Sequence, residues 1–185
     1  MKLTSSEFAA AMGICPYSSR QKLFRIKKGT QERDPMNDFM QWGIDNEFKA
    51  VASAEAITGK VFKHTGDRQK HYVMATSEGE YGTTPDGSAD YLGLEVKCPQ
   101  SLKDDVPVHY LPQLQGQMWI AGFSQVLFLQ WTEEESRAWM VQKSDDYIFD
   151  MKQLLKDFRL SFEENTEPKR RKKPVLPFLT IERVE

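Results

Sequence analysis

The sequence contains few of the residues that build covalent frameworks or histidine-based metal centres. Its 185 residues include only two cysteines, Cys15 and Cys98, and three histidines. Two cysteines are too few for a four-cysteine zinc or iron–sulfur site, and their scarcity is typical of a protein from a reducing compartment. The histidines, His64, His71 and His109, show no metal-ligand spacing. We therefore expect neither a disulfide framework nor a histidine metal site.

Long apolar runs and an excess of either charge are also lacking. No apolar run approaches the ~20 residues of a membrane span, and no secretory signal segment is evident. The 25 lysines and arginines nearly balance 27 acidic residues, which leaves a net charge of −2. Any DNA-binding site must therefore be a local basic region. The 39% of hydrophobic residues and the lack of an internal repeat predict a cytoplasmic globular protein with no membrane contact.

One stretch combines two carboxylates and a lysine. Residues 84–87, which include Asp86, predict a tight turn because they contain a proline and a glycine. The apolar run from Leu92 to Cys98 predicts a buried strand that Pro99 ends. Side chains alternate along a strand, so Glu95 and Lys97 share one face.

This arrangement suits metal-assisted phosphodiester hydrolysis. Mg²⁺ prefers oxygen ligands and keeps several waters, so Asp86, Glu95 and a backbone carbonyl can hold it against a phosphate. Lys97 can orient the attacking water, lower its pKa or offset charge in the transition state. The alternative is a half-exposed ion pair between Glu95 and Lys97. The spacing alone does not decide, because Glu-x-Lys occurs three times in the chain.

Two predicted helices carry polar side chains beside apolar stripes. The first begins at Asp34-Pro35, ends at Gly59 and contains Glu47 within its inward stripe; that stripe is Met40, Ile44, Glu47, Val51 and Ala54. Glu47 either points to the metal site or packs its stem while its head reaches water. The second helix spans Tyr110 to Ile120. Its polar stripe (Tyr110, Gln113 and Gln117) either holds a lysine, a water or a phosphate, or faces solvent.

The N-terminal third offers two places for a phosphate. A capping box at residues 4–7 precedes a helix from Phe8 to Met12, and free N–H groups near Ser6 either cradle a phosphate or form a plain N-cap. A second helix, from Ser18 to Gly29, carries five cations and no acid. Its cations, which include Arg20 and Arg25, either contact the DNA backbone or are solvated.

The other segments predict a mainly antiparallel sheet and one further helix. Strands are expected at 60–64 and 71–76, in an antiparallel meander that ends at Lys97. Residues 125–131 and 137–142 predict a hairpin, and 145–162 an amphipathic helix. Beyond Asn165 the composition becomes basic. We therefore expect one domain at residues 1–165 and a mobile basic tail at 166–185.

The order of four sequence blocks resembles the phage-type recombination exonucleases, the lambda exonuclease family of the PD-(D/E)xK restriction-endonuclease-like nucleases. These blocks are 3–20, 43–47, 84–99 and 110–119. The resemblance implies an α/β fold with a mixed central sheet flanked by helices. It also implies a Mg²⁺-dependent enzyme, with Mn²⁺ as substitute, that digests one strand of linear double-stranded DNA from 5′ to 3′. The product is a 3′ single-strand overhang for homologous recombination.

The resemblance also implies roles by position. The implied metal ligands are Asp86, Glu95 and the carbonyl of Val96, while Lys97 acts on the nucleophilic water. Gln113 supports Lys97 or the water, and Glu47 lies in the outer part of the metal site. Some members carry a phosphate-binding arginine ahead of the first helix; here Ser6 and Arg20 are the candidates for the 5′-phosphate, with Arg25 as a further DNA contact.

For the whole protein, the resemblance implies a ring-shaped homotrimer around DNA ends. It further implies a single-strand-annealing recombination protein as partner and the cytoplasm of a bacterial host, as for a phage or prophage protein. Two alternatives stay open. One is a DNA endonuclease on the same fold, and the other is a DNA-end-binding module without catalysis.

Overall fold

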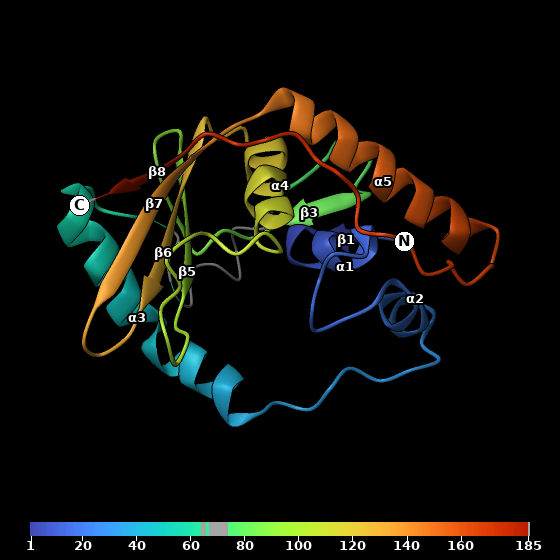
Figure 1. Cartoon of the computed structure of the whole chain (residues 1–185), viewed down its shortest axis with the longest axis horizontal. Helices are drawn as coiled ribbons and strands as arrows, with labels where there is room; N and C mark the ends of the chain where they lie inside the picture. Colours follow the sequence, from blue (N-terminus) through green and yellow to red (C-terminus); the bar gives the residue numbers. More distant parts are fainter. Residues whose placement is uncertain (64–65, 67–73, 185) are drawn as a thin grey trace.

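The central five-stranded sheet positions the predicted site. The structure is a computed structural model that describes residues 1–63, 66 and 74–184. The sheet has the order β4-β5-β6-β7-β8 (Figure 1). Its strands are β4 (Gly87–Ala89), β5 (Leu92–Lys97), β6 (Gln125–Trp131), β7 (Ser136–Gln142) and β8 (Ile181–Val184). β5 and β6 run parallel, whereas the other neighbours run antiparallel. The expected mixed sheet is therefore confirmed.

Two helices cover opposite faces of β5 and β6. The second half of α3 (Asp38–Thr58) packs on Leu94 and Val96. On the other face, Leu114 and Met118 of α4 (Leu111–Ala121) pack on Phe128. Both strands are covered on both sides, which explains their nearly unbroken apolar sequences. The connection from β5 to β6 runs through α4 (Figure 1). Gln113 and Gln117 of this helix donate to Glu95, so α4 lies over the face that carries Glu95 and Lys97.

A second layer of elements lies against α4. It contains a three-stranded sheet of order β1-β3-β2, with β1 (Leu3–Thr4), β2 (Met74–Ala75) and β3 (Tyr81–Thr83). The same layer contains the 3-10 helix η1 (Ser5–Glu7) and the helices α1 (Phe8–Met12), α2 (Arg20–Lys28) and α5 (Asp145–Glu163). Phe8, Leu23 and Phe158 are among the residues of their shared core. Glycines end α1, α2 and α3 at positive φ, as predicted.

The start and the outer face of α3 differ from the prediction. Asn37, rather than Asp34, caps the helix by accepting a hydrogen bond from the Met40 backbone N–H at 2.9 Å. The predicted inward stripe holds only for its second half, where Val51 and Ala54 are buried. Met40 and Ile44 are 48% and 56% exposed, because the first half of α3 does not pack on the sheet.

The predicted antiparallel meander is divided between the two sheets. β2 and β3 pair in the small sheet, whereas β4 and β5 pair in the large one. The strand expected at 60–64 is reduced to a bridge between Lys63 and Ser88, and position 64 lies outside the described residues. Of the strand expected at 71–76, only Met74–Ala75 is described as strand, and 71–73 lie outside the description.

The segment predicted as a mobile basic tail returns to the sheet. Its last residues form β8, which pairs antiparallel with β7. The basic residues before it have no regular secondary structure. Within the described residues, no helix is both long enough and apolar enough to cross a membrane.

Close packing of α4 on η1 and α1 gives a stability prediction. A Cβ added at Gly116 would lie 2.7 Å from a ring carbon of Phe8 and 3.1 Å from the Ser5 Cβ. We expect Gly116→Ala to lower the free energy of unfolding by about 1–3 kcal/mol, because the core must shift. The matched control is Gly43→Ala in α3, where nothing lies within 4 Å. This change should stabilise by about 0.5–1 kcal/mol.

Urea unfolding of both variants measures these changes. Equal stabilisation by the two alanines would show that the α4 contact with Phe8 is looser than described.

Candidate active site

The site is built around the carboxylate of Glu95, which is 1% exposed. Its Oε1 accepts hydrogen bonds from the Lys97 ammonium and from Gln113 Nε2, the latter at 2.7 Å. Its Oε2 accepts from Gln117 Nε2 at 2.5 Å. Burial of a carboxylate is costly unless charge and hydrogen bonds compensate it, and here three donors do so. The half-exposed surface pair is therefore not what the structure shows.

Helix α4 supplies both amides from one face. Gln113 and Gln117 are one helical turn apart, so the polar stripe predicted for this helix points at Glu95. Tyr110 from the same stripe places its ring 5.3 Å from the Lys97 ammonium. Gln117 belongs to the predicted polar stripe, but only Gln113 was assigned an individual role; the structure shows that Gln117 contacts Glu95 as directly as Gln113 does.

The turn before β4 holds Asp86 against β5. The Asp86 backbone N–H donates to the Leu94 carbonyl at 2.9 Å, and its Oδ2 accepts from the Val96 N–H at 2.8 Å. Two bonds to the strand that carries Glu95 fix this side chain beside it. The structure thus brings Asp86, Glu95 and Lys97 together, as predicted from the turn and the strand.

The charges of these groups act on one another. Burial raises the pKa of Asp86 well above its ordinary value, and the charges of Glu95 and Glu47 raise it further. Burial lowers the pKa of Lys97, but Glu95 and Asp86 outweigh this effect, so the net pKa is raised and the lysine stays protonated. One ammonium therefore faces several carboxylates.

Glu47 reaches the same space from α3. Burial raises the pKa of the Cys98 thiol to about 11, and the nearby charges of Glu47 and Asp86 add to the rise. Glu47 also raises the pKa of Asp86. The predicted orientation of Glu47 toward the acid cluster thus agrees with these effects.

The donor set suits a hard divalent cation. Mutually repelling carboxylates and a strand carbonyl are oxygen ligands that Mg²⁺ accepts, and this ion keeps water in its remaining positions. In residues 1–63, 66 and 74–184, however, no group of three or more acid, histidine or cysteine side chains is arranged to hold a metal. A cation here would rest on Asp86, Glu95 and the Val96 carbonyl, with the charge of Glu47 farther out.

The predicted phosphate-binding residues are not joined in one contact network. Arg20, 5% exposed, donates to Asp157 at 2.8 Å. It lines a cavity of about 300 Å³ with Arg170 and Arg171 from the basic C-terminal segment. Arg25 instead makes two hydrogen bonds to Glu167 at the surface, of 2.8 and 2.6 Å. Ser6 is exposed and shares a hydrogen bond with Thr4. The basic cavity at Arg20 was not foreseen, because its other arginines come from the end of the chain.

A mixed sheet with helices on both faces, an acid in the turn before β4, and an acid and a lysine on β5 define the restriction-endonuclease-like class of fold. The chain belongs to the YqaJ-like viral recombinase domain family, which matches residues 1–124. The resemblance to phage-type recombination nucleases is thereby confirmed.

Solved structures share this fold. An alkaline exonuclease, LHK-Exo from Laribacter hongkongensis, has a TM-score of 0.73 at 23% identity, with 89% of each chain covered. Its complex with dAMP gives 0.74 at 22% identity, again with 89% of each chain covered. A phage related exonuclease from Haemophilus somnus 129PT gives 0.68 at 13% identity, covering 89% of this chain and 95% of that one. Among curated protein sequences, none matches.

The raised pKa of Asp86 predicts a stability gain when its charge is removed. The folded-state pKa lies above the ordinary 3.8, so folding stability is lost as the pH rises from 3.8 through the folded value. Asp86→Asn should therefore raise the free energy of unfolding of the metal-free protein at pH 7.5, because it removes the charge that burial disfavours. The gain should vanish below pH 3.8, where Asp86 is protonated in both states.

Chemical unfolding in EDTA between pH 3.5 and 8 measures this gain, with exposed Asp45→Asn as the control. Added Mg²⁺ or Mn²⁺ should raise the Tm of the wild type but not of Asp86→Asn. A variant that is no more stable than wild type at any pH would contradict the raised pKa of Asp86.

Proposed function

We propose that this protein is a Mg²⁺-dependent exonuclease that degrades one strand of linear double-stranded DNA from 5′ to 3′. Its products would be mononucleotides and a 3′ single-strand overhang for phage-type homologous recombination. The observation that carries the proposal is the buried Glu95 carboxylate, held by Lys97 and two amides with Asp86 beside it. Membership of a viral recombinase family supports it, as does a fold shared with proteins described as exonucleases.

In this mechanism, Asp86, Glu95 and the Val96 carbonyl would hold the Mg²⁺, and Mn²⁺ could replace it. When bound, the ion would supply Lewis-acid chemistry at the phosphate and at the attacking water. Lys97, which stays protonated, orients the attacking water and offsets the charge that develops on the phosphate oxygens. Gln113 holds the Glu95 carboxylate in position against Lys97, because it donates to the same carboxylate oxygen that Lys97 contacts. Glu47 adds negative charge in the outer part of the site.

The 5′-phosphate of the substrate would bind at the basic cavity that contains Arg20. The Arg20 Nε is buried and has no hydrogen-bond partner within the described residues. The cavity also lies at the N-terminus of α2, where Ser18 and Ser19 line it. Arg25 and Ser6 remain candidates for further contacts with the DNA backbone.

The assembly and partners are proposed on the same basis. A homotrimer around the DNA end, with a single-strand-annealing protein as partner, needs an apolar contact surface. The first half of α3 and the segment before it offer one, since these large side chains are 48–68% exposed: Met36, Phe39, Met40, Ile44 and Phe48. Residues 1–165 would form the nuclease domain and 166–185 a basic C-terminal segment, in a cytoplasmic protein of phage or prophage origin.

The proposal is tested with a linear duplex that carries a 5′-phosphate, incubated with Mg²⁺, Mn²⁺ or EDTA. Metal-dependent release of mononucleotides from the 5′ end supports it. Equal cutting of a covalently closed circle would indicate a DNA endonuclease instead. Tight binding of DNA ends without nucleotide release in either metal would indicate a DNA-end-binding module without catalysis.

The role of Lys97 gives a kinetic prediction. Lys97→Ala should lower the cleavage rate about a hundredfold or more, because the ammonium acts mainly in the transition state. The Kd for DNA ends, measured in Ca²⁺, should change by less than about tenfold. Exposed Lys143, paired with Asp145, provides the control variant Lys143→Ala. A loss of binding as large as the loss of rate would contradict a transition-state role.

The proposed phosphate cavity gives a prediction about substrate preference. Arg20→Gln should reduce the preference for a 5′-phosphate over a 5′-hydroxyl duplex about tenfold or more, since a charged hydrogen bond contributes about 1.5–3 kcal/mol. Asp157→Asn removes the partner of Arg20 but keeps the cation, so it should retain the preference. If instead Ser6→Ala or Arg25→Ala abolishes the preference and Arg20→Gln keeps it, the phosphate binds elsewhere.

A further inference from the structure

A second cavity lies directly beside Lys97. Its volume is about 430 Å³, within the ~300–1,000 Å³ range of ligand pockets. Lys97 lines it from β5 and Gln130 from β6, with Tyr17, His109 and Tyr110 as its aromatic residues. We call it the Gln130 cavity. Because Lys97 forms part of its wall, whatever occupies it lies next to the reacting phosphate.

The Gln130 side chain, which lines this cavity, carries a buried donor without a partner in the described residues. Gln130 is 2% exposed, and its Oε1 accepts a hydrogen bond from the Lys103 backbone N–H at 2.9 Å. A reversed amide would face that N–H with another donor, so this contact fixes which end is oxygen. The Nε2 then has no partner among the described residues. A buried donor without an acceptor is costly, and an acceptor on a bound ligand would satisfy it.

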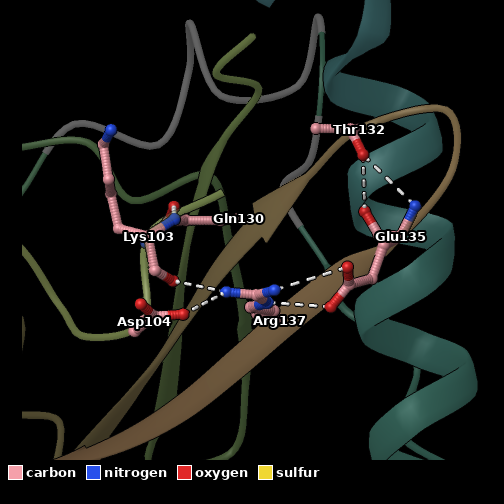
Figure 2. A network of polar contacts seen from close by, with 6 residues as sticks. All are labelled: Lys103, Asp104, Gln130, Thr132, Glu135 and Arg137. Carbon is pink, nitrogen blue, oxygen red and sulfur yellow. Dashed lines mark hydrogen bonds and ion pairs between the residues drawn. The ribbon is translucent and has the colours of Figure 1, made fainter. Parts of the chain in front are cut away.

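A network of polar contacts keeps this donor in place (Figure 2). Arg137 of β7 donates to the Lys103 carbonyl at 3.4 Å, to Asp104 at 2.7 Å and to Glu135 at 2.8 Å. These bonds tie the segment between β5 and α4 to the strands beneath it. Lys103 is thereby held over Gln130, and the amide keeps its direction.

An aromatic row forms another wall of the cavity. The ring of Tyr17, which is 74% exposed, lies 5.5 Å from that of His109, and His109 lies 4.2 Å from Tyr110. The His109 Nε2 is buried and, like the Gln130 Nε2, has no partner in the described part of the chain. Burial and the charge of Lys97 lower the pKa of His109. The neutral ring can therefore offer either an acceptor or a donor.

These features together select the chemical class of the ligand. Lys97 and Lys103 are balanced by Asp104 and Asp105 at the cavity wall, so a phosphate gains little net attraction. Aromatic rings and neutral amide and imidazole groups suit a planar, neutral ring with polar edges. Nucleobases have such faces and edges, and every base carries at least one hydrogen-bond acceptor.

We infer that the Gln130 cavity receives the nucleobase of a nucleotide beside the scissile phosphodiester, with the Gln130 Nε2 donating to an edge acceptor. The inference rests on the proposed nuclease function. The base must leave the double helix to enter, which costs stacking and pairing energy, and stacking on the aromatic row offsets part of this cost. Since every base has a flat face and an acceptor, the contact positions the strand without selecting a sequence.

A double-mutant cycle between protein and DNA tests this contact. Gln130→Met keeps the length of the side chain but removes the donor. The substrates are linear duplexes with either an intact 5′ end or abasic residues at the first two positions of the cut strand. On intact ends, Gln130→Met should lower kcat/KM about two- to tenfold, the range of one neutral hydrogen bond. On abasic ends it should cause no further loss, because the acceptor is already missing.

Gln125→Met is the matched control, because it makes the same change on the same strand at a residue paired with Gln142 instead. It should lower the rates on both ends equally or not at all. Equal losses for Gln130→Met on intact and abasic ends would overturn the inference. Melting curves of each variant confirm that folding is retained.

The same cycle measured as equilibrium binding of DNA ends in Ca²⁺ separates this inference from the proposed function. Coupling in binding without any nucleotide release would remove the exonuclease proposal and leave the base-binding cavity in place. Nucleotide release without coupling in either measurement would leave the exonuclease proposal in place and remove the base-binding cavity.

Discussion

The structure depends on compensation of one buried negative charge. The Glu95 carboxylate is almost fully withdrawn from solvent, a state that costs several kcal/mol unless charge and hydrogen bonds replace the lost water. Lys97 supplies the charge from the same strand, and α4 supplies two amides one turn apart. Both amides reach Glu95 because the connection from β5 to β6 lays α4 across this face. The apolar contacts of Leu114 and Met118 with Phe128 hold the helix at that position.

Carboxylates outnumber cations in the site. Lys97 offers one positive charge, whereas Asp86, Glu95 and Glu47 bring carboxylates to the same region from the turn, the strand and α3. Burial, together with this repulsion, raises the pKa of Asp86 and makes this part of the fold less stable than an uncharged core would be. Such a loss is typical of functional sites, where binding requires groups that do not stabilise the free protein. A divalent cation would offset this repulsion directly, which is the electrostatic basis of the proposed metal-assisted chemistry.

The features that depend only on residues close together in the sequence were predicted correctly. The alternation along β5 placed Glu95 and Lys97 on one face, and the helical period placed Gln113 and Gln117 together, so the centre of the site followed from sequence. The start of α3 did not follow, because Asp34-Pro35 and Asn37 are both acceptable capping signals and only the path of the chain decides between them. The exposure of Met40 and the pairing of β8 with β7 depend on how far the sheet extends. No local pattern carries that information.

The register between β5 and β6 links the proposed catalytic lysine to the proposed base-binding cavity. Lys97 is paired with Gln130 across the parallel ladder, so the two side chains leave the sheet as neighbours on the face that also carries Glu95. A slip of one residue would turn either side chain to the face covered by α3. The apolar residues on both faces of β6 therefore fix more than the core, since their burial also sets where Gln130 lies relative to Lys97. Arg137 extends this constraint to β7, because its bonds to the segment after β5 keep Lys103 above the Gln130 amide. The geometry that compensates the charge of Glu95 thus also determines the position of the donor next to it.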